Sequence, residues 1–389
     1  MDFRFLPAIE EFRTEVREFL DETLTAEFRA DPELVQEGGF SREFTRRLGE
    51  RGWLTLAWPE EYGGQQRSHF EQLVYNEEMA RSSAPGRAHM MAVGLVGPSI
   101  MMHGNEQQKA HYLPKIAAGE ICFCQGFSEP GAGSDLAGLQ LRAEREGDEY
   151  VVTGQKIWTS DAHRADFCWI GTRTDPEAPK HRGISTFILD MQSPGIDVQP
   201  LLSMGDHHHF NEFFLGEVRI PAENRVGDEN RGWYYMTTTL DFERSGAATF
   251  VAVQQSLDRT RRYFVEERPG GERGGDDQRR SGLADLMIAA TAGRWISYRV
   301  VWLQSHGRVP NYESSMSKLF GSTLSTEIAN QGVRMAGLYG QLAPSSPHAP
   351  LDGRLEDAYI WGAAAGIRGG TNEVQRNIIA TRGLGLPRG

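Results

Sequence analysis

The stretch Cys124-Gln-Gly-Phe-Ser-Glu-Pro-Gly-Ala-Gly-Ser-Asp135 is the part of the chain that decides the fold. It follows an apolar run and contains a Glu-Pro turn with two glycines, Gly131 and Gly133. Glycines at such positions let the backbone approach a ligand closely or adopt a positive φ. The hydroxyls of Ser128 and Ser134, together with exposed amides, suit a polar cofactor ring or a phosphate.

A second segment, Gly154-Gln-Lys-Ile-Trp-Thr-Ser160, follows further along the chain and ends a strand-like pattern with one aromatic ring and two hydroxyls. Either segment alone is a weak signal, because a Gly/Ser turn is usually only a turn. Trp158 alone is equally well explained as an ordinary core aromatic at the end of a strand. The information lies in the order and spacing of the two segments together.

The composition indicates a globular protein of two or three packed units, since 389 residues is long for a single domain. The net charge of -12, with no basic block to offset it, argues against a nucleic-acid-binding surface. No run of about 18 apolar residues occurs, so a membrane span is not expected. The first residues, Met1-Asp-Phe-Arg, do not resemble a signal peptide, and we expect a cytoplasmic location.

Two groups of residues invite a metal assignment, and other interpretations fit both better. Cys122 and Cys124 share one face of a strand-like run but lack a neighbouring Cys or His pair, which favours buried small side chains in a reducing compartment. The adjacent histidines His207-His-His209 would point alternately in a strand and cannot all bind one ion. We therefore expect them in an exposed loop.

The periodicity predicts an α+β multidomain protein in the order helices, strands, helices. We expect an N-terminal α-helical domain over residues 1–120, a middle β domain (a small barrel or sandwich) over 121–227, and a C-terminal four-helix-bundle domain over 228–389. Helical spacing predicts helices over 5–24, 41–52, 70–81, 89–102, 106–118, 233–266, 279–303, 314–335 and 355–365, with a last helix starting near 371. Alternation of apolar and polar residues predicts strands over 149–153, 167–171, 184–190 and 211–221.

This order and these motifs resemble the acyl-CoA dehydrogenase family, flavoenzymes that desaturate acyl-CoA thioesters between Cα and Cβ. The resemblance covers essentially the whole chain. Besides the two segments above, the matching motifs are Gly104-Asn-Glu-Gln-Gln-Lys109, Tyr112-Leu-Pro-Lys-Ile-Ala-Ala-Gly119, Ser315-Met-Ser-Lys-Leu-Phe320 and Gly370-Thr-Asn-Glu-Val-Gln-Arg-Asn-Ile-Ile379. The set is specific for the family but not for a substrate.

The resemblance implies FAD as the cofactor and assigns residues to it. Those implied to contact the flavin from the middle domain are Gln125, Phe127, Ser128, Gly133, Trp158, Thr159 and Ser160. Trp158 matches the residue that covers one face of the ring, and Thr159 and Ser160 match donors at its edge near N5. Ser134 matches the family's contact to the thioester substrate.

The reaction needs a base for the acidic Cα proton, a hydride acceptor, and donors that stabilise charge on the thioester oxygen. Glu243 lies among apolar residues, where desolvation would raise its pKa and its basicity. Asp241 and Arg244 would be neighbours on the same helix surface, placed to hold polar parts of CoA. For an arbitrary glutamate, a solvated helix face would be the better interpretation.

The resemblance favours Glu243 as the base. Most family members carry the catalytic glutamate just before the Gly-Thr of the C-terminal motif, and the matching position here is Gly369. A smaller group, which includes enzymes similar to isovaleryl-CoA dehydrogenase, carries the base on a bundle helix instead, at the position of Glu243. A missing acid at one site and a present acid at the other point to the second arrangement.

Two further regions bear on FAD binding and assembly. Gly370, Thr371 and Glu373 open the last helix, whose free amides would meet the cofactor or else form a plain helix cap. Homotetrameric members carry Arg-x-x-Phe-Gly in a loop that grips the neighbouring subunit's FAD. Here the segment reads Glu267-Arg-Pro-Gly-Gly271 without the phenylalanine, although Gln278 matches a downstream glutamine.

The sequence thus predicts an FAD-dependent acyl-CoA dehydrogenase that passes electrons to an electron-transfer flavoprotein. It is similar to the base-bearing subunit of actinobacterial heterotetramers that act on steroid-side-chain thioesters, so both a homotetramer and a heterotetramer with a paralogous subunit stay open. An acyl-CoA oxidase, a flavin hydroxylase of the same fold, or a structural subunit are the alternatives. The small residues Gly246, Ala247 and Ala248 beside Glu243 suggest room for a bulky acyl chain.

Overall fold

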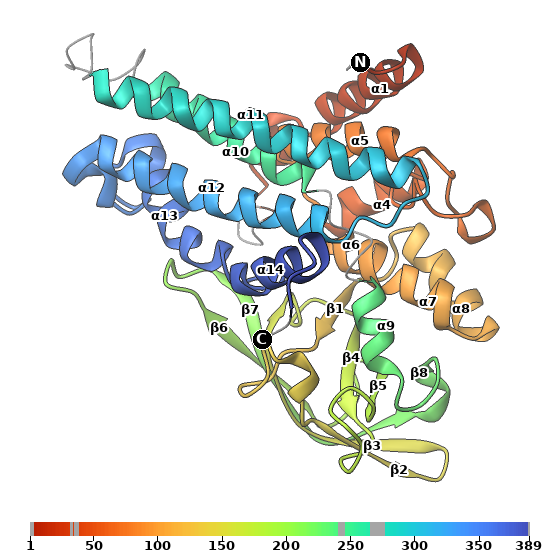
Figure 1. Ribbon diagram of the computed structural model, residues 1–389. Helices are drawn as coiled ribbons and strands as arrows, with labels where there is room; N and C mark the ends of the chain where they lie inside the picture. Colours follow the sequence, from red (N-terminus) through yellow and green to blue (C-terminus); the bar gives the residue numbers. More distant parts are fainter. Residues whose placement is uncertain (1–3, 32–33, 35–38, 240–245, 265–276, 388–389) are drawn as a thin grey trace. The chain divides into compact units, whose positions relative to one another are not determined.

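The computed structural model describes residues 4–31, 34, 39–239, 246–264 and 277–387. Contacts between Cα atoms divide the chain into two compact units, which we call the sheet unit and the helical unit. The sheet unit contains all the strands and several short helices. The helical unit combines two helices from the first quarter of the chain with the long helices of its last third (Figure 1). The expected α+β architecture with an N-terminal helical region, a middle sheet and a C-terminal helical region is confirmed.

The sheet unit is built on one eight-stranded sheet in the order β6-β7-β3-β2-β4-β5-β8, with β1 paired to β4. Its strands are β1 (Phe123–Gly126), β2 (Arg142–Glu146), β3 (Glu149–Ser160), β4 (Phe167–Arg173), β5 (Ile184–Asp190), β6 (Ile196–Leu202), β7 (His208–Pro221) and β8 (Arg225–Val226). The helices of this unit are α2 (Ala26–Arg29), α4 (Arg42–Glu50), α6 (Arg87–Met91), α7 (Gly97–His103), α8 (Glu106–Ala117) and α9 (Gly232–Thr239). The pairs β1–β4 and β2–β4 are parallel, and the remaining pairs are antiparallel.

The centre of the sheet is buried on both faces. Trp169 and Ile188 pack in one apolar cluster with helix residues such as Ile100. Neighbouring positions on the same strands point to the opposite face, where Phe187 packs in a second cluster with Phe213 of β7. Burial on both faces explains why β5 is apolar along most of its length rather than alternating.

The helical unit consists of α1 (Pro7–Thr23), α5 (His69–Arg81), α10 (Ala247–Arg262), α11 (Asp277–Ser305), α12 (Tyr312–Ala336), α13 (Arg354–Ala365) and α14 (Asn372–Ile378). Phe250 of α10 fills the space left by two glycines on neighbouring helices. A Cβ on Gly293 of α11 would lie 2.1 Å from its ring, and a Cβ on Gly321 of α12 would lie 3.4 Å from it. No described helix in either unit is long and apolar enough to cross a membrane.

The single helix expected over residues 233–266 is wrong, because the chain turns before α10. Gly246 has a φ of +72°, a left-handed conformation that ends regular helix, and α10 begins at Ala247. A Cβ on Gly246 would lie 2.7 Å from the Ser317 hydroxyl oxygen, so the close approach of α12 also requires glycine here. Periodicity alone does not reveal this break, since glycine is tolerated inside many helices.

The other predicted helices and strands are present, with two kinds of difference. The helix expected over 89–102 contains a π-helical turn at Ala92–Val96 between α6 and α7. The strand pattern does not predict β2, β6 or the two-residue β8; β2 is mostly polar and exposed, and β6, although largely apolar, has no fully buried side chain. Such strands are held by their neighbours in the sheet rather than by burial of one apolar face.

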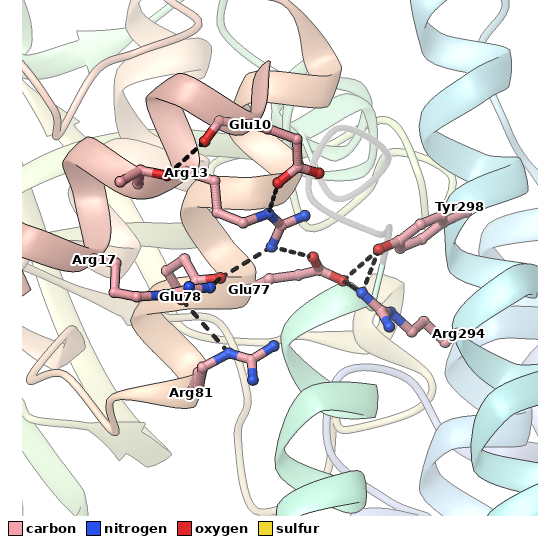
Figure 2. Close-up of polar contacts among 9 residues, drawn as sticks. Glu10, Arg13, Arg17, Glu77, Glu78, Arg81, Arg294 and Tyr298 are labelled. Carbon is pink, nitrogen blue, oxygen red and sulfur yellow. Dashed lines mark hydrogen bonds and ion pairs between the residues drawn. The ribbon is translucent and has the colours of Figure 1, made fainter. Parts of the chain in front are cut away.

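A buried network of charges joins α1, α5 and α11 within the helical unit (Figure 2). The carboxylate of Glu77, which is fully buried, accepts hydrogen bonds from Arg13 at 2.9 Å, Arg294 at 3.1 Å and the Tyr298 hydroxyl at 2.7 Å. Burial by itself lowers the pKa of the Arg13 guanidinium, but hydrogen bonds to Glu78 and Glu77 outweigh it, so this pKa is raised. Glu77 of α5 therefore links α1, near the start of the chain, to α11 in its last third.

We expect Glu77→Gln to lower the apparent free energy of unfolding by about 3 kcal/mol, because it leaves the buried guanidinium of Arg13 and the half-buried one of Arg294 short of a counter-charge. The matched control is Glu10→Gln, which removes the half-exposed partner of the same Arg13. That change should cost under about 1 kcal/mol. Urea denaturation of both variants measures the difference, and equal losses would contradict this account of the network.

Candidate active site

The two sequence segments that define the candidate site lie side by side in the sheet unit. The Ile157 amide on β3 donates a hydrogen bond of 3.0 Å to the carbonyl of Ser128, which follows β1. The Lys156 ammonium donates to the carbonyl of Phe127 at 3.0 Å and to the carboxylate of Glu129 at 2.8 Å. Backbone and side-chain bonds thus attach the Gly/Ser loop to the strand that carries Trp158.

The ion pair between Lys156 and Glu129 is buried. Lys156 is fully buried and the Glu129 side chain is 9% exposed. Glu129 also accepts from the amides of Gln140 at 2.6 Å and Leu141 at 2.9 Å, so its carboxylate is well satisfied. Burial lowers the pKa of Lys156, and the charge of Glu129 opposes this shift. Through these bonds the ion pair connects the Pro130 turn to β3 on one side and to the segment at Gln140 and Leu141 on the other.

The loop glycines do not use the conformational freedom that the sequence suggested. Neither Gly131 nor Gly133 has a positive φ, so that part of the prediction is wrong. A Cβ on either residue would meet no described atom within 4 Å. Both residues and the adjacent Ser134 are exposed, so the backbone at this turn is accessible to a ligand.

Trp158 is held in an unusual position on β3. The β3–β7 ladder shifts register between Lys156 and Thr159, and Trp158 within this bulge has a φ of +60°. A bulky side chain rarely adopts this left-handed conformation. The indole is 60% exposed and meets Phe210 edge-on, with ring centroids 5.9 Å apart. The exposure of its side chain rules out the alternative interpretation of Trp158 as an ordinary core aromatic at the end of a strand.

Buried side-chain atoms without a hydrogen-bond partner in the described part of the chain include the Thr159 hydroxyl, next to Trp158, and the Gln125 nitrogen on β1. Buried polar groups are almost always paired in folded proteins, so unpaired atoms beside an exposed indole fit a polar, flat ligand such as an isoalloxazine ring. Ser128 and Ser160 are half-buried at the same corner. Phe127 is itself buried and packs on Trp169, at 5.1 Å between ring centroids.

The C-terminal motif lies in the helical unit. Gly369 and Gly370 both have positive φ, and the Thr371 hydroxyl caps α14 by accepting from the Val374 amide at 3.2 Å. Asn372 accepts from Lys318 at 3.0 Å and from Ser322 at 2.8 Å. These bonds join the family motif at 370–379 to the one at 315–320 on α12.

The remaining predicted residues fall into two groups. Glu373 is exposed and pairs with Arg376 at 3.3 Å within α14. Glu243, Asp241 and Arg244 lie outside the described residues, as does the segment 267–271, and Gln278 lies in the first turn of α11 with a side chain that is not described. Their roles stay predictions.

Several residues at this site were not singled out from the sequence. Lys156 and Glu129 stand within the quoted motifs, but nothing in their spacing shows that they pair.

The prediction for the three adjacent histidines is only partly right. His208 and His209 open β7 and are half-buried, so the exposed-loop expectation is wrong for them and right only for His207. Asn211 of β7 is fully buried and contacts His163, His208 and Thr159.

The cysteine prediction is confirmed in its main point. All three cysteines are free and buried, and Cys124 of β1 lies opposite Cys168 of β4 in the parallel register. Burial raises the pKa of the Cys122 thiol to about 11, so it stays protonated at neutral pH. No group of three or more His, Cys, Asp or Glu side chains suited to a metal ion occurs among the residues described.

The order of helices, sheet and further helices points to a class of oxidoreductase. So does the meeting of the loop at 128–135 with β3 beside the exposed indole of Trp158. Models of the acyl-CoA dehydrogenase N-terminal, middle and C-terminal domains match residues 7–120, 124–218 and 230–384 respectively. The chain therefore belongs to the acyl-CoA dehydrogenase family, whose members are oxidoreductases that act on acyl-CoA and are generally FAD-dependent.

Individual relatives agree with this assignment. The chain is 38% identical to acyl-CoA dehydrogenase FadE26 of Mycobacterium tuberculosis, over 100% of this chain and 99% of the relative. Among solved structures it is similar to the Tcur3481-Tcur3483 steroid ACAD, with a TM-score of 0.89, 35% identity and 100% coverage of both chains. It is equally similar to the ChsE4-ChsE5 complex from Mycobacterium tuberculosis, with a TM-score of 0.89, 37% identity and 100% coverage of both.

We expect Lys156→Met to destabilise the sheet unit by about 3 kcal/mol, because it leaves the Glu129 carboxylate buried without its cation. Adding Glu129→Gln should recover part of this loss, since the double variant buries no unpaired charge. Lys180→Met is the control, because Lys180 pairs with Asp135 at the surface and should contribute under about 1 kcal/mol. Urea denaturation tests the cycle, and strictly additive losses would show that the two residues are not coupled.

Proposed function

We propose that this chain is an FAD-dependent acyl-CoA dehydrogenase that introduces a double bond between Cα and Cβ of an acyl-CoA thioester. The observation that carries the proposal is the Trp158 corner, where an exposed indole on a strained bulge is followed directly by the buried, unpaired hydroxyl of Thr159; the Gln125 side-chain nitrogen on β1 is also buried and unpaired. A flat polar ring would satisfy these atoms and cover the indole.

The side chains of the sheet unit then have distinct roles toward the cofactor. Trp158 packs against one face of the ring, while Thr159 and Ser160 donate hydrogen bonds to its edge, with Gln125, Phe127, Ser128 and Gly133 completing the surroundings. FAD, when bound, supplies the hydride acceptor at its N5 position. Ser134, exposed at the tip of the loop, is placed for the thioester. In the helical unit we assign Gln278, Gly370, Thr371 and Glu373 to the cofactor, with Thr371 also capping α14.

Glu243 is the base in this proposal, and it removes the proton from Cα. The support comes from Gly369, which stands where most family members carry the catalytic glutamate. It has no side chain and adopts a φ of +64°. A glutamate at Gly369 would have to adopt that left-handed φ, which is rare for residues other than glycine. Asp241 and Arg244 are assigned to polar parts of CoA.

The substrate that we propose is a bulky, ring-bearing acyl thioester of the kind attached to steroid side chains. One similar solved structure is described as a steroid ACAD. Electrons would leave through an electron-transfer flavoprotein.

We also propose assembly with a related chain into a heterotetramer. Both similar structures carry two protein names in their descriptions, and one is called a complex. Exposed apolar side chains recur every seven residues on α11, at Ile288, Trp295 and Trp302. This is the spacing of a seam between packed helices, which suits burial against another subunit.

Glu243→Gln should slow flavin reduction by a CoA thioester about 10²–10⁴-fold, since the amide keeps the shape of the base but cannot accept a proton. Glu327→Gln, an exposed position on α12, is the charge-matched control and should behave as the unsubstituted chain. Anaerobic stopped-flow bleaching of the visible flavin absorption measures the rate of flavin reduction in both variants. Bleaching of Glu243→Gln at the original rate would rule out this base.

A panel of straight, branched and steroid-derived CoA thioesters tests the substrate. We expect kcat/KM to be at least about tenfold higher for the steroid-derived members, because added apolar contact contributes about that factor or more. Preference for short straight chains would contradict the substrate proposal while leaving the dehydrogenase chemistry intact. Peroxide released at the turnover rate in air would identify oxygen as the acceptor instead.

A further inference from the structure

The corner at Trp158 needs support from both sides, because its backbone conformation is unfavourable. A non-glycine residue at positive φ persists only where its surroundings impose that conformation. On the N-terminal side, the Ile157 amide is fixed by the Ser128 carbonyl at 3.0 Å. On the C-terminal side, the Thr159 carbonyl accepts a hydrogen bond from a side chain of the facing strand, that of Asn211.

Asn211 lies opposite Thr159 in the β3–β7 register and is fully buried. Its Nδ2 donates a hydrogen bond of 3.1 Å to the Thr159 carbonyl. A carbonyl oxygen can only accept, so this bond fixes which way the Asn211 amide faces. The bond lies at the point where the β3–β7 register resumes after the bulge.

Two histidines complete the hydrogen bonding of Asn211. Its Nδ2 lies 3.0 Å from His163 Nδ1, and its Oδ1 lies 2.8 Å from His208 Nε2. Since Nδ2 can only donate and Oδ1 can only accept, His163 Nδ1 must be the acceptor and His208 Nε2 must carry a proton. The proton of a neutral His163 therefore sits on Nε2, which is buried without a partner in the described residues.

The surroundings keep His163 neutral. Burial is the main cause that lowers its pKa to about 4, with a smaller contribution from His208, whose ring stacks on it at 4.1 Å between centroids. Arg87, which pairs with Asp161, adds positive charge nearby. A neutral imidazole can accept at Nδ1, so the bond from Asn211 is available at neutral pH.

We propose that Asn211 is a positioning residue for the cofactor: held by His163 and His208, it fixes the Thr159 backbone and so keeps the Trp158–Thr159 corner in the shape that receives the flavin. The inference rests on the proposed function, since FAD is the ligand that the corner receives. A purely structural asparagine would stabilise the sheet equally with and without FAD. A positioning asparagine contributes specifically to the affinity for FAD.

The test is a titration of the full-length apoprotein with FAD at pH 7.5, followed by the visible flavin spectrum. We expect Asn211→Leu to weaken FAD binding about tenfold or more, because one net hydrogen bond is worth about that factor and the corner relaxes as well. His163→Leu removes the acceptor for Asn211, together with the stacking on His208, and should weaken binding about threefold to tenfold.

His163→Asn is the rescue variant, since its amide oxygen takes the place of Nδ1, and it should bind FAD within about twofold of the original chain. Gln155→Ala is the matched control. It removes another hydrogen bond between the same two strands, from Gln155 to Glu212 at 2.7 Å, and should leave FAD affinity unchanged within about twofold.

Two results would overturn the inference: His163→Asn as weak as His163→Leu, or Asn211→Leu no weaker than Gln155→Ala. If Asn211→Leu does not fold, as judged by circular dichroism, the two His163 variants still decide. An original chain that binds no FAD would contradict the proposed function itself, and the inference with it. If the original chain binds FAD and the variants bind it with the same affinity, the inference alone is contradicted.

Discussion

The buried ion pair between Lys156 and Glu129 is the constraint on which the candidate site depends. The loop at 128–135 has few apolar side chains of its own, so packing alone does not set its position. Burying two charges is costly unless both are hydrogen-bonded, and here the carboxylate and the ammonium each have further partners. The loop and β3 are consequently held at one separation, and the corner between them has a defined shape.

That shape explains the two unusual features of the corner. The attached loop fixes the backbone before Trp158, and the facing strand fixes it afterwards, so a strained bulge survives and directs an indole outward. The same arrangement leaves polar atoms of Thr159 and Gln125 buried but unpaired. A strained backbone and a buried, unpaired polar group both lower the stability of the fold, and folded proteins keep such features mainly at binding sites. The chain belongs to a family of acyl-CoA oxidoreductases that are generally FAD-dependent, and the flavin ring is the ligand that we propose for these groups.

The sequence predicted the parts of the fold that depend on local pattern. The amphipathic helix near residues 5–24 and the apolar strand at 184–190 are both present, because burial of one face or of both faces leaves a clear period. The break at Gly246 was missed, since a glycine in a helical pattern does not reveal that it adopts a left-handed φ. The motifs likewise singled out the loop at 128–135 and Trp158, but not the pairing of Lys156 with Glu129 or the bonds around Asn211. Those contacts join residues far apart in the chain, and no local periodicity encodes them.

The central claim is that the Trp158 corner is one wall of a flavin site served by a base at Glu243. A crystal structure of the purified chain with FAD and an unreactive thioester analogue tests it most directly. The account predicts the isoalloxazine ring against Trp158, the Thr159 hydroxyl within hydrogen-bond distance of its edge, and the Glu243 carboxylate beside Cα of the analogue. A flavin bound elsewhere, or a different acid beside Cα, would contradict it.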